Sequence, residues 1–151
     1  RDSATQLTVN VTLPTDGTYF IRVENPDGLA ARSSSAILTV SDAPTWSTSA
    51  GSLGSVAAGA SASFSVSASS DSTVAYSETT SVLTSNTDTP ASTMNLSLNS
   101  STGAITGTAP AATSETTYNF TLRATDAESQ TADRAFSITV TVGMNNSGQF
   151  N

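Results

Sequence analysis

The sequence contains no cysteine, no histidine and no lysine, so all five of its basic residues are arginine. Without cysteine the chain can build neither a disulfide framework nor a thiolate zinc site. Without histidine it lacks the commonest general base and metal ligand, and without lysine it lacks Schiff-base chemistry and the P-loop. None of its twelve acidic residues lies in a context typical of a catalytic carboxylate pair. We therefore expect a protein that is not an enzyme and that needs no cofactor.

Charged residues and long apolar runs are also scarce. Charged residues make up 11% of the chain, and the net charge is −7. A chain of this acidity lacks the positive surface that nucleic-acid binding requires. No apolar run approaches the roughly 18 residues that predict a transmembrane helix. We expect neither nucleic acid nor a membrane among the partners. Because the chain opens on Arg1 and not on methionine, we also expect a fragment or a processed product.

Serine and threonine are abundant, together accounting for 53 of the 151 residues. Threonine favours strands, and the apolar residues recur at every second position, as in half-buried strands. Turn-forming clusters such as Asn25-Pro26-Asp27-Gly28 separate these alternating runs. The pattern predicts an all-β chain of short strands, typical of a sandwich. The expected strands lie at 7–13, 19–23, 36–40, 62–68, 74–76, 96–98, around 105, 118–124 and 136–142.

An internal repeat with a period near 100 residues runs through the sequence. Residues 18–23, Thr-Tyr-Phe-Ile-Arg-Val, correspond to residues 117–122, Thr-Tyr-Asn-Phe-Thr-Leu. Residues 36–40, Ala-Ile-Leu-Thr-Val, correspond to residues 136–140, Phe-Ser-Ile-Thr-Val. About 100 residues is the length of one immunoglobulin-like domain. Each copy is therefore expected to be the closing hairpin of such a domain.

The repeat predicts how the chain is divided. Residues 1–43 are expected to be the C-terminal part of a first module, whose opening strands are absent or supplied by something else. Residues 44–142 are expected to form one complete immunoglobulin-like β-sandwich. Residues 143–151 would be a linker or a docking tail. In both modules the equivalent tyrosines, Tyr19 and Tyr118, are expected to point inward.

Three segments carry resemblances to known families. Residues 18–28, TYFIRVENPDG, resemble the end of an IPT/TIG immunoglobulin-like domain. Residues 96–108 and 118–128 resemble the motifs of putative-Ig, dystroglycan-type cadherin-like domains. These resemblances imply tandem immunoglobulin-like modules over most of the chain. Such modules occur in bacterial adhesins, secreted enzymes and phage structural proteins, and the tandem order with this Ser/Thr/Ala-rich composition is most similar to virion proteins of tailed phages.

We therefore expect a non-enzymatic structural or display component of a phage virion, as a capsid decoration, fibre or tail-surface protein. Its location would be the virion surface, outside the cell. Its partners would be capsid or tail proteins and copies of itself, with a host-surface glycan as a further candidate. The alternative is a segment of a bacterial cell-surface adhesin, or a carbohydrate-binding accessory module of a secreted enzyme.

One candidate metal site follows from the resemblance to cadherins. Asp126, Glu128 and Asp133 resemble the acidic cluster that cadherin repeats use to bind calcium at their junctions. Calcium takes six to eight oxygen ligands, and the acidic residue expected after the last strand is missing here. The alternative is a solvated hairpin turn capped by aspartate, and Asp71 likewise reads as a turn residue that bonds its own backbone.

Three apolar residues are candidates for contacts with other molecules. Ile37, Trp46 and Phe150 are expected to be exposed near the module junction and the ends of the chain, where a neighbouring subunit could cover them. Trp46 and Phe150 are also the rings on which a sugar could stack. For Trp46, the alternative is a ring that closes the end of the core.

The division predicts which part of the chain folds alone. Residues 44–142 contain both faces of a sandwich, so a protein of these residues should unfold cooperatively in urea. A peptide of residues 1–43 has three expected strands with open edges, so it should be disordered or aggregated. Circular dichroism and sedimentation of the two pieces would test this. A cooperatively folded monomer of residues 1–43 would contradict the assignment.

Overall fold

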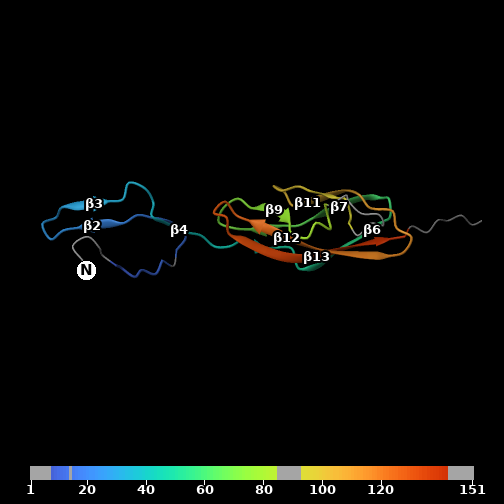
Figure 1. The fold of residues 1–151 in the computed structure, drawn as a ribbon, viewed down its shortest axis with the longest axis horizontal. Helices are drawn as coiled ribbons and strands as arrows, with labels where there is room; N and C mark the ends of the chain where they lie inside the picture. Colours follow the sequence, from blue (N-terminus) through green and yellow to red (C-terminus); the bar gives the residue numbers. More distant parts are fainter. Residues whose placement is uncertain (1–7, 14, 85–92, 143–151) are drawn as a thin grey trace, which may run out of the picture. The chain divides into compact units, whose positions relative to one another are not determined.

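The computed structural model describes residues 8–13, 15–84 and 93–142, and these form strands without any helix (Figure 1). None of them therefore belongs to a helix long and apolar enough to cross a membrane. The chain divides into two compact units, unit 1 (Arg1–Asp42) and unit 2 (Ala43–Asn151). The expected docking tail and Phe150 lie outside the described residues.

Unit 2 is an immunoglobulin-like β-sandwich of two main sheets. One sheet has the strand order β6-β13-β12-β9 and the other β10-β11-β7, while β5 pairs with β8. Strand β6 runs parallel to β13, and the other pairs are antiparallel. The strands are β5 (Thr45–Trp46), β6 (Gly51–Ala57), β7 (Ser61–Ser65), β8 (Ala68–Ser69), β9 (Ala75–Glu78), β10 (Ser97–Leu98), β11 (Ala104–Thr108), β12 (Thr116–Thr125) and β13 (Thr131–Thr141).

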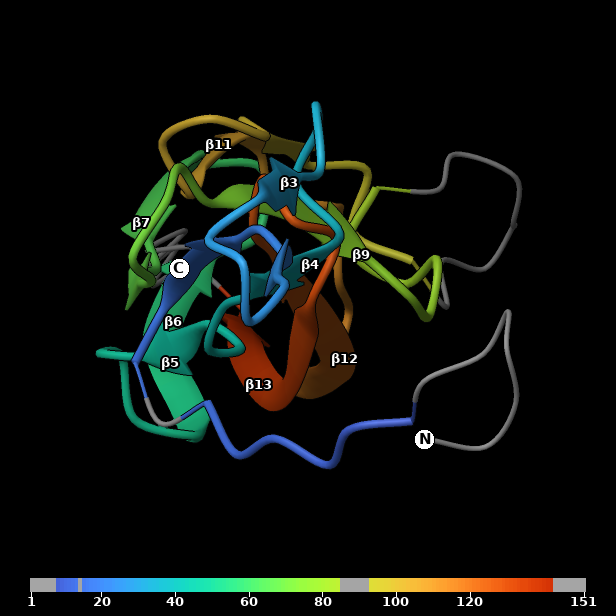
Figure 2. The same cartoon turned by 90° about the vertical axis from the view of Figure 1, so that its left-hand side faces the viewer.

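The core of unit 2 lies between these sheets, with β7 and β11 on one side and β12 and β13 on the other (Figure 2). The alternation predicted for 118–124 and 136–140 is confirmed, because every second side chain of these strands is buried. Tyr118 is among them and is buried as expected. The fully buried large side chains are Phe136, Leu83, Met94, Ile105, Leu122, Ile138 and Val140.

Strands β5 and β6 were not expected from the sequence. Glycine is unfavourable in strands, and β6 contains Gly51 and Gly54. A register shift in the partner strand between Ser137 and Ile138 lets the β6 residue Leu53 stand outside the regular pairing. The parallel pairing to β13 thus accepts a glycine-containing, irregular strand that carries no clear alternation.

Unit 1 consists of two short strand pairs. Strand β1 (Gly17–Tyr19) pairs with β4 (Leu38–Val40), and β2 (Arg22–Glu24) pairs with β3 (Ala30–Arg32). The strand expected at 19–23 is therefore shared between β1 and β2. The expected turn after β2 is present, with the amide of Leu29 donating to a side-chain oxygen of Asp27 at 3.0 Å.

The strand expected at 7–13 is wrong for the residues that the structure describes, since 8–13 have no strand pairing. Val9 and Val11 are both well exposed there. Alternation makes a strand only where a neighbouring strand takes up the backbone hydrogen bonds. Among the described residues, no strand pairs with this segment.

The internal repeat appears as equivalent pairing over three residue pairs, Gly17–Tyr19 with Leu38–Val40 in unit 1 and Thr116–Tyr118 with Ile138–Val140 in unit 2. Tyr19 lies opposite Leu38 in unit 1, and Tyr118 lies opposite Ile138 in unit 2. One step further, Thr18 faces Thr39, as Thr117 faces Thr139. In unit 1, the hydroxyl of Tyr19 donates to the carbonyl of Thr15. The β1–β4 pair is thus built on the same plan as β12–β13.

Gly103 and Gly59 provide a matched test of the sandwich. Both have positive φ, +69° and +73°, but an added Cβ at Gly103 would lie 2.3 Å from the carbonyl oxygen of Val66, while Gly59 has open space. Alanine at Gly59 should cost only the backbone strain, about 1 kcal/mol. Alanine at Gly103 should cost about 3 kcal/mol, because strain and overpacking add. Urea denaturation of the two variants measures the difference, and equal losses would contradict the geometry.

Candidate functional sites: an acidic loop cluster and an exposed apolar groove

Three carboxylates converge where two loops of unit 2 meet. Asp71 comes from the turn after β8, and Asp126 and Glu128 come from the turn between β12 and β13. Their oxygen atoms lie within 4.8 Å of one another. Asp126 is buried, whereas Asp71 and Glu128 are exposed. The sequence predicted two of these three residues and took Asp71 for a turn residue, because only the fold brings it near the others.

Asp126 organises the turn in which it lies. Its Oδ1 accepts the amide of Gln130 at 2.7 Å, and its own amide donates to the carbonyl of Gln130 at 3.0 Å. The amide of Ser129, a residue with φ of 70°, donates to the Asp126 carbonyl. Asp126 therefore caps the hairpin turn, as the alternative to a calcium site predicted. The prediction that this turn is solvated is wrong for Asp126, whose side chain is 5% exposed.

Serine hydroxyls join the two loops. Ser72 Oγ accepts the amide of Ala127 at 3.1 Å and donates to Glu128 at 2.5 Å. Ser70 Oγ lies 3.0 Å from Asp71 Oδ1 and 3.5 Å from Asp126 Oδ2. The acidic cluster thus belongs to a hydrogen-bonded network that links the turn after β8 to the β12–β13 turn.

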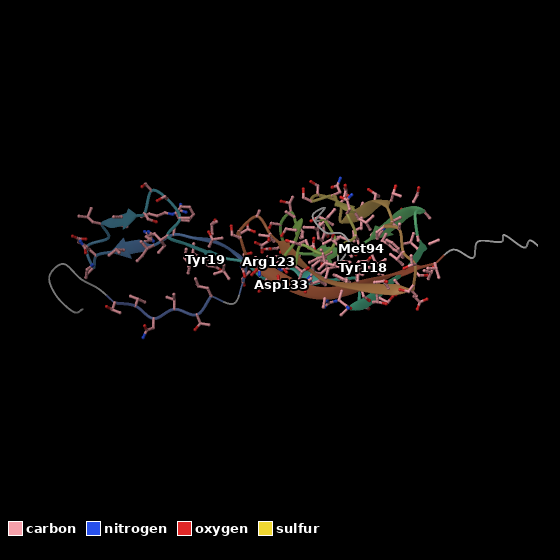
Figure 3. All side chains as sticks on the ribbon, turned by 45° about the vertical axis from the view of Figure 1, so that its right-hand side comes forward. Tyr19, Met94, Tyr118, Arg123 and Asp133 are labelled. Atoms are coloured by element: carbon pink, nitrogen blue, oxygen red, sulfur yellow. The ribbon has the colours of Figure 1, made fainter. Side chains whose placement is uncertain are left out.

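Asp133 lies apart from this cluster and is held by Arg123. The guanidinium donates to both carboxylate oxygens, at 2.7 and 2.8 Å, across paired positions of β12 and β13 (Figure 3). The hydrogen bonds from Arg123 hold the pKa of Asp133 below its ordinary value. The structure therefore separates Asp133 from Asp126 and Glu128. The remaining group consists of three carboxylates, those of Asp71, Asp126 and Glu128, whereas calcium takes six to eight oxygen ligands.

Trp46 is buried, which corrects the expectation that its ring is exposed for contacts. It is 6% exposed, and its Nε1 donates to the carbonyl of Ala132 at 3.0 Å. The ring packs on Tyr76 and Phe136, with centroids 5.8 and 5.3 Å away. Arg134 donates to the carbonyl of Thr48 at 2.7 Å beside it. Trp46 therefore packs as a core residue, in agreement with the alternative prediction of a ring that closes the end of the core.

Glu78 holds the loop at residues 82–84 in place, a role that the sequence analysis did not predict. Its Oε1 accepts the amides of Val82 and Leu83 at 2.6 and 2.8 Å, and its Oε2 accepts the amide of Thr84 at 3.0 Å. Hydroxyls of Thr80 and Thr84 also donate to it, each at 2.9 Å. Burial alone raises the pKa of Glu78, but the hydrogen bonds from Leu83, Thr80 and Thr84 outweigh it and lower the pKa. The carboxylate thereby fixes the loop that places Leu83 in the core.

An open groove lies in unit 1. It has a volume of about 500 Å³ and is lined mainly by apolar side chains. Ile37 is exposed, as expected, and lies in its wall. Arg22 and Glu24 also line the groove and pair with each other at 2.8 Å. The remaining lining residues are Val9, Val11, Leu13, Tyr19, Phe20, Ile21, Val23 and Leu38.

Comparison with protein families matches the greater part of the chain. The model of a family described as a putative Ig domain covers residues 43–141. A search of curated proteins gives no match.

Two solved structures are among those to which the chain shows a similarity. One is a chimeric titin Z1Z2 functionalized with a KLER exogenous peptide from decorin, with 20% identity, a TM-score of 0.42, and coverage of 70% of this chain and 100% of that chain. The other is protocadherin gamma B7, extracellular cadherin domains 1-4, with 14% identity, a TM-score of 0.47, and coverage of 88% of this chain and 41% of that chain.

The carboxylate of Glu78 makes the stability of unit 2 depend on pH. A carboxylate with a lowered pKa stabilises the fold fully above its unfolded pKa, near the ordinary value of 4.5, and loses this effect as the pH falls through the lower folded value. Glu78→Gln should reduce the unfolding free energy at pH 7 by about 2 kcal/mol, since an amide cannot accept all these donors. The substitution should also make the unfolding free energy depend less steeply on pH below pH 4.5.

Urea denaturation at pH 7 and at acid pH measures both effects. Asp133→Asn is the matched control, because it removes an exposed carboxylate whose pKa is also lowered but which holds no loop. Its effect should be the smaller of the two. A Glu78→Gln loss no larger than that of an exposed ion pair, as measured with Asp133→Asn, would contradict the proposed role of Glu78 in the loop.

Proposed function

The chain belongs to the putative Ig domain family through residues 43–141, and on that premise we propose that it is a non-enzymatic structural and display component of a phage virion. In this role it is a capsid decoration, fibre or tail-surface protein, located on the outside of the particle. Its partners are capsid or tail proteins and further copies of itself. An immunoglobulin-like sandwich is compatible with a structural or surface-display role.

The hydrogen bonding within unit 2 supports a role as a rigid spacer. Among the described residues, no buried side-chain nitrogen or oxygen lacks a hydrogen-bond partner. Glu78, Asp126 and the serines around the acidic cluster hold loops in place, as shown by their bonds to backbone amides. Polar groups used in this way stiffen a module rather than perform chemistry. A stiff, polar, acidic module suits display on a crowded surface.

The exposed groove of unit 1 is the observation that carries the proposal. Of the nine large apolar residues that are exposed among the described ones, eight belong to unit 1. Contiguous exposed apolar surface marks a site of contact with another protein. A component that is assembled with neighbours has a use for such a surface, whereas a freely dissolved monomer does not.

The phage setting rests on the sequence. Residues 18–28 resemble an IPT/TIG module and precede a putative Ig domain, and the Ser/Thr/Ala-rich composition of this tandem is most similar to tailed-phage virion proteins. The module itself also occurs in adhesins, so particle association is the property to measure.

Purified virions of a phage that encodes the chain provide the test. Quantitative mass spectrometry should find it in a fixed ratio to the major capsid or tail protein, and antibodies should label intact particles. Incubation with a calcium chelator should not release it, because Asp126 and Glu128 already accept hydrogen bonds from Gln130 and Ser72 within the fold. If the chain is absent from washed particles, the adhesin is favoured instead. A full-length protein with a secretion signal and a cell-wall anchor would also favour the adhesin.

A further inference from the structure

The first and the last strand of the four-stranded sheet of unit 2 lie side by side and run in the same direction (Figure 2). Strand β6 is paired in parallel with β13 over six residue pairs, from Gly51 opposite Phe136 to Ala57 opposite Thr141. The segment through which the chain enters the sheet is therefore bonded directly to the segment through which it leaves.

Further hydrogen bonds extend this contact at both of its ends. Before β6, the indole of Trp46 donates to the carbonyl of Ala132, and Arg134 donates to the carbonyl of Trp46 at 3.4 Å. After β6, the amide of Ala58 donates to the carbonyl of Thr141 at 2.8 Å. The segment from Trp46 to Ala58 is thus bonded to the last strand from Ala132 to Thr141.

The direction of β6 and β13 decides how unit 2 responds to a pull on the chain. A pull from the N-terminal side reaches β6 at Gly51, and a pull from the C-terminal side reaches β13 at Thr141. These two residues lie at opposite ends of the ladder. Tension therefore acts along the strands, and the hydrogen bonds between them share the load. If these strands were antiparallel, both pulls would act at one end and the residue pairs would separate one after another.

We propose that unit 2 is a load-bearing module in which the β6–β13 ladder resists tension along the chain. Within the described sheet, β6 is an edge strand whose one neighbour is β13, whereas β13 is also paired with β12 over ten residue pairs. The sliding of β6 along β13 is therefore the rupture that breaks fewer pairs. It also exposes Leu53 and Val56, which pack against the core.

Resistance to tension is a further property beyond display. Unit 1 precedes unit 2 in the same chain, so a pull on unit 1 is transmitted to β5 and then to β6. Forced unfolding is governed by the barrier to rupture and not by the equilibrium stability. The orientation of the loaded strands therefore matters in addition to the free energy of unfolding. The test needs only the isolated chain, so its failure would leave the virion measurement unaffected.

Pulling the chain in two directions in an optical trap tests the proposal. The chain has no cysteine, so introduced cysteines define where the handles attach. Cysteines added at the two ends of the chain load the ladder along its strands. Ala60→Cys, on the exposed turn after β6, combined with a cysteine at the C-terminal end, instead peels the ladder from Ala57 and Thr141.

Unfolding of unit 2 in the end-to-end direction should lengthen the chain by roughly 300 Å, the extended length of residues 45–141 less their folded span. It should require about twice the force of the peeling direction or more, because the residue pairs share the load. Equal forces in the two directions, or an end-to-end extension without a distinct unfolding step, would overturn the proposal.

A variant of the ladder itself can be measured at constant load. Ala58→Pro removes the amide that donates to Thr141. The turn accepts proline there, since the amide of Ala60 donates to the carbonyl of Ala57 and the following Gly59 has a φ of 73°, as in a type II turn. Under end-to-end load, this variant should unfold about five times faster or more, the effect of one hydrogen bond lost from the barrier.

Asn99→Ala is the matched control. It removes two hydrogen bonds, those that the amides of Ser101 and Thr102 donate to Asn99, from a turn of the other sheet. Because that turn is still intact when β6 slides, the unfolding rate under load should stay within a factor of about two of the original. If Ala58→Pro accelerates unfolding no more than Asn99→Ala does, the load lies elsewhere and the proposal is wrong.

Discussion

The pairing of β12 with β13 is the interaction on which unit 2 depends. It is the longest ladder, running from Thr116 opposite Val140 to Thr125 opposite Thr131. Its inward side chains make most of one wall of the core, and β6 and β9 extend its sheet on either side. The start of unit 2 is tied to it as well, since Trp46 donates to Ala132 and Arg134 donates to Thr48. A sandwich without disulfides is thereby closed by packing and backbone hydrogen bonds.

Sequence patterns predicted the parts whose structure follows from local alternation. An antiparallel strand with one buried and one solvated face shows a period of two, so the class of fold and the burial of Tyr118 could be predicted. Strand β6 could not, because a parallel edge strand with two glycines shows no such period. The approach of Asp71 to Asp126 and the loop held by Glu78 arise from contacts between distant segments, which no local pattern encodes. The same holds for Trp46, whose burial depends on Ala132 and Phe136.

The two hairpins show where local patterns stop being informative. Residues 18–23 and 117–122 have the same alternation, yet 117–122 pair throughout with β13 and are covered, whereas 18–23 are divided between the β1–β4 and β2–β3 pairs and their apolar face is exposed. Alternation tells which side chains share a face, but the covering layer is supplied by other strands. The segment 8–13 illustrates the same limit, since its valines alternate without a partner strand. Burial is a property of the assembled sheets.

Two acidic residues of unit 2 have a structural role in its loops. Loops at the ends of a sandwich carry backbone amides that need acceptors, and Glu78 and Asp126 accept them from inside the fold. A cation at the Asp71–Asp126–Glu128 cluster would compete with Gln130 for Asp126 and with Ser72 for Glu128. Each carboxylate therefore stabilises its loop in the absence of a metal. In the proposed role of a display module, such loops would keep the shape of unit 2 without a bound ion.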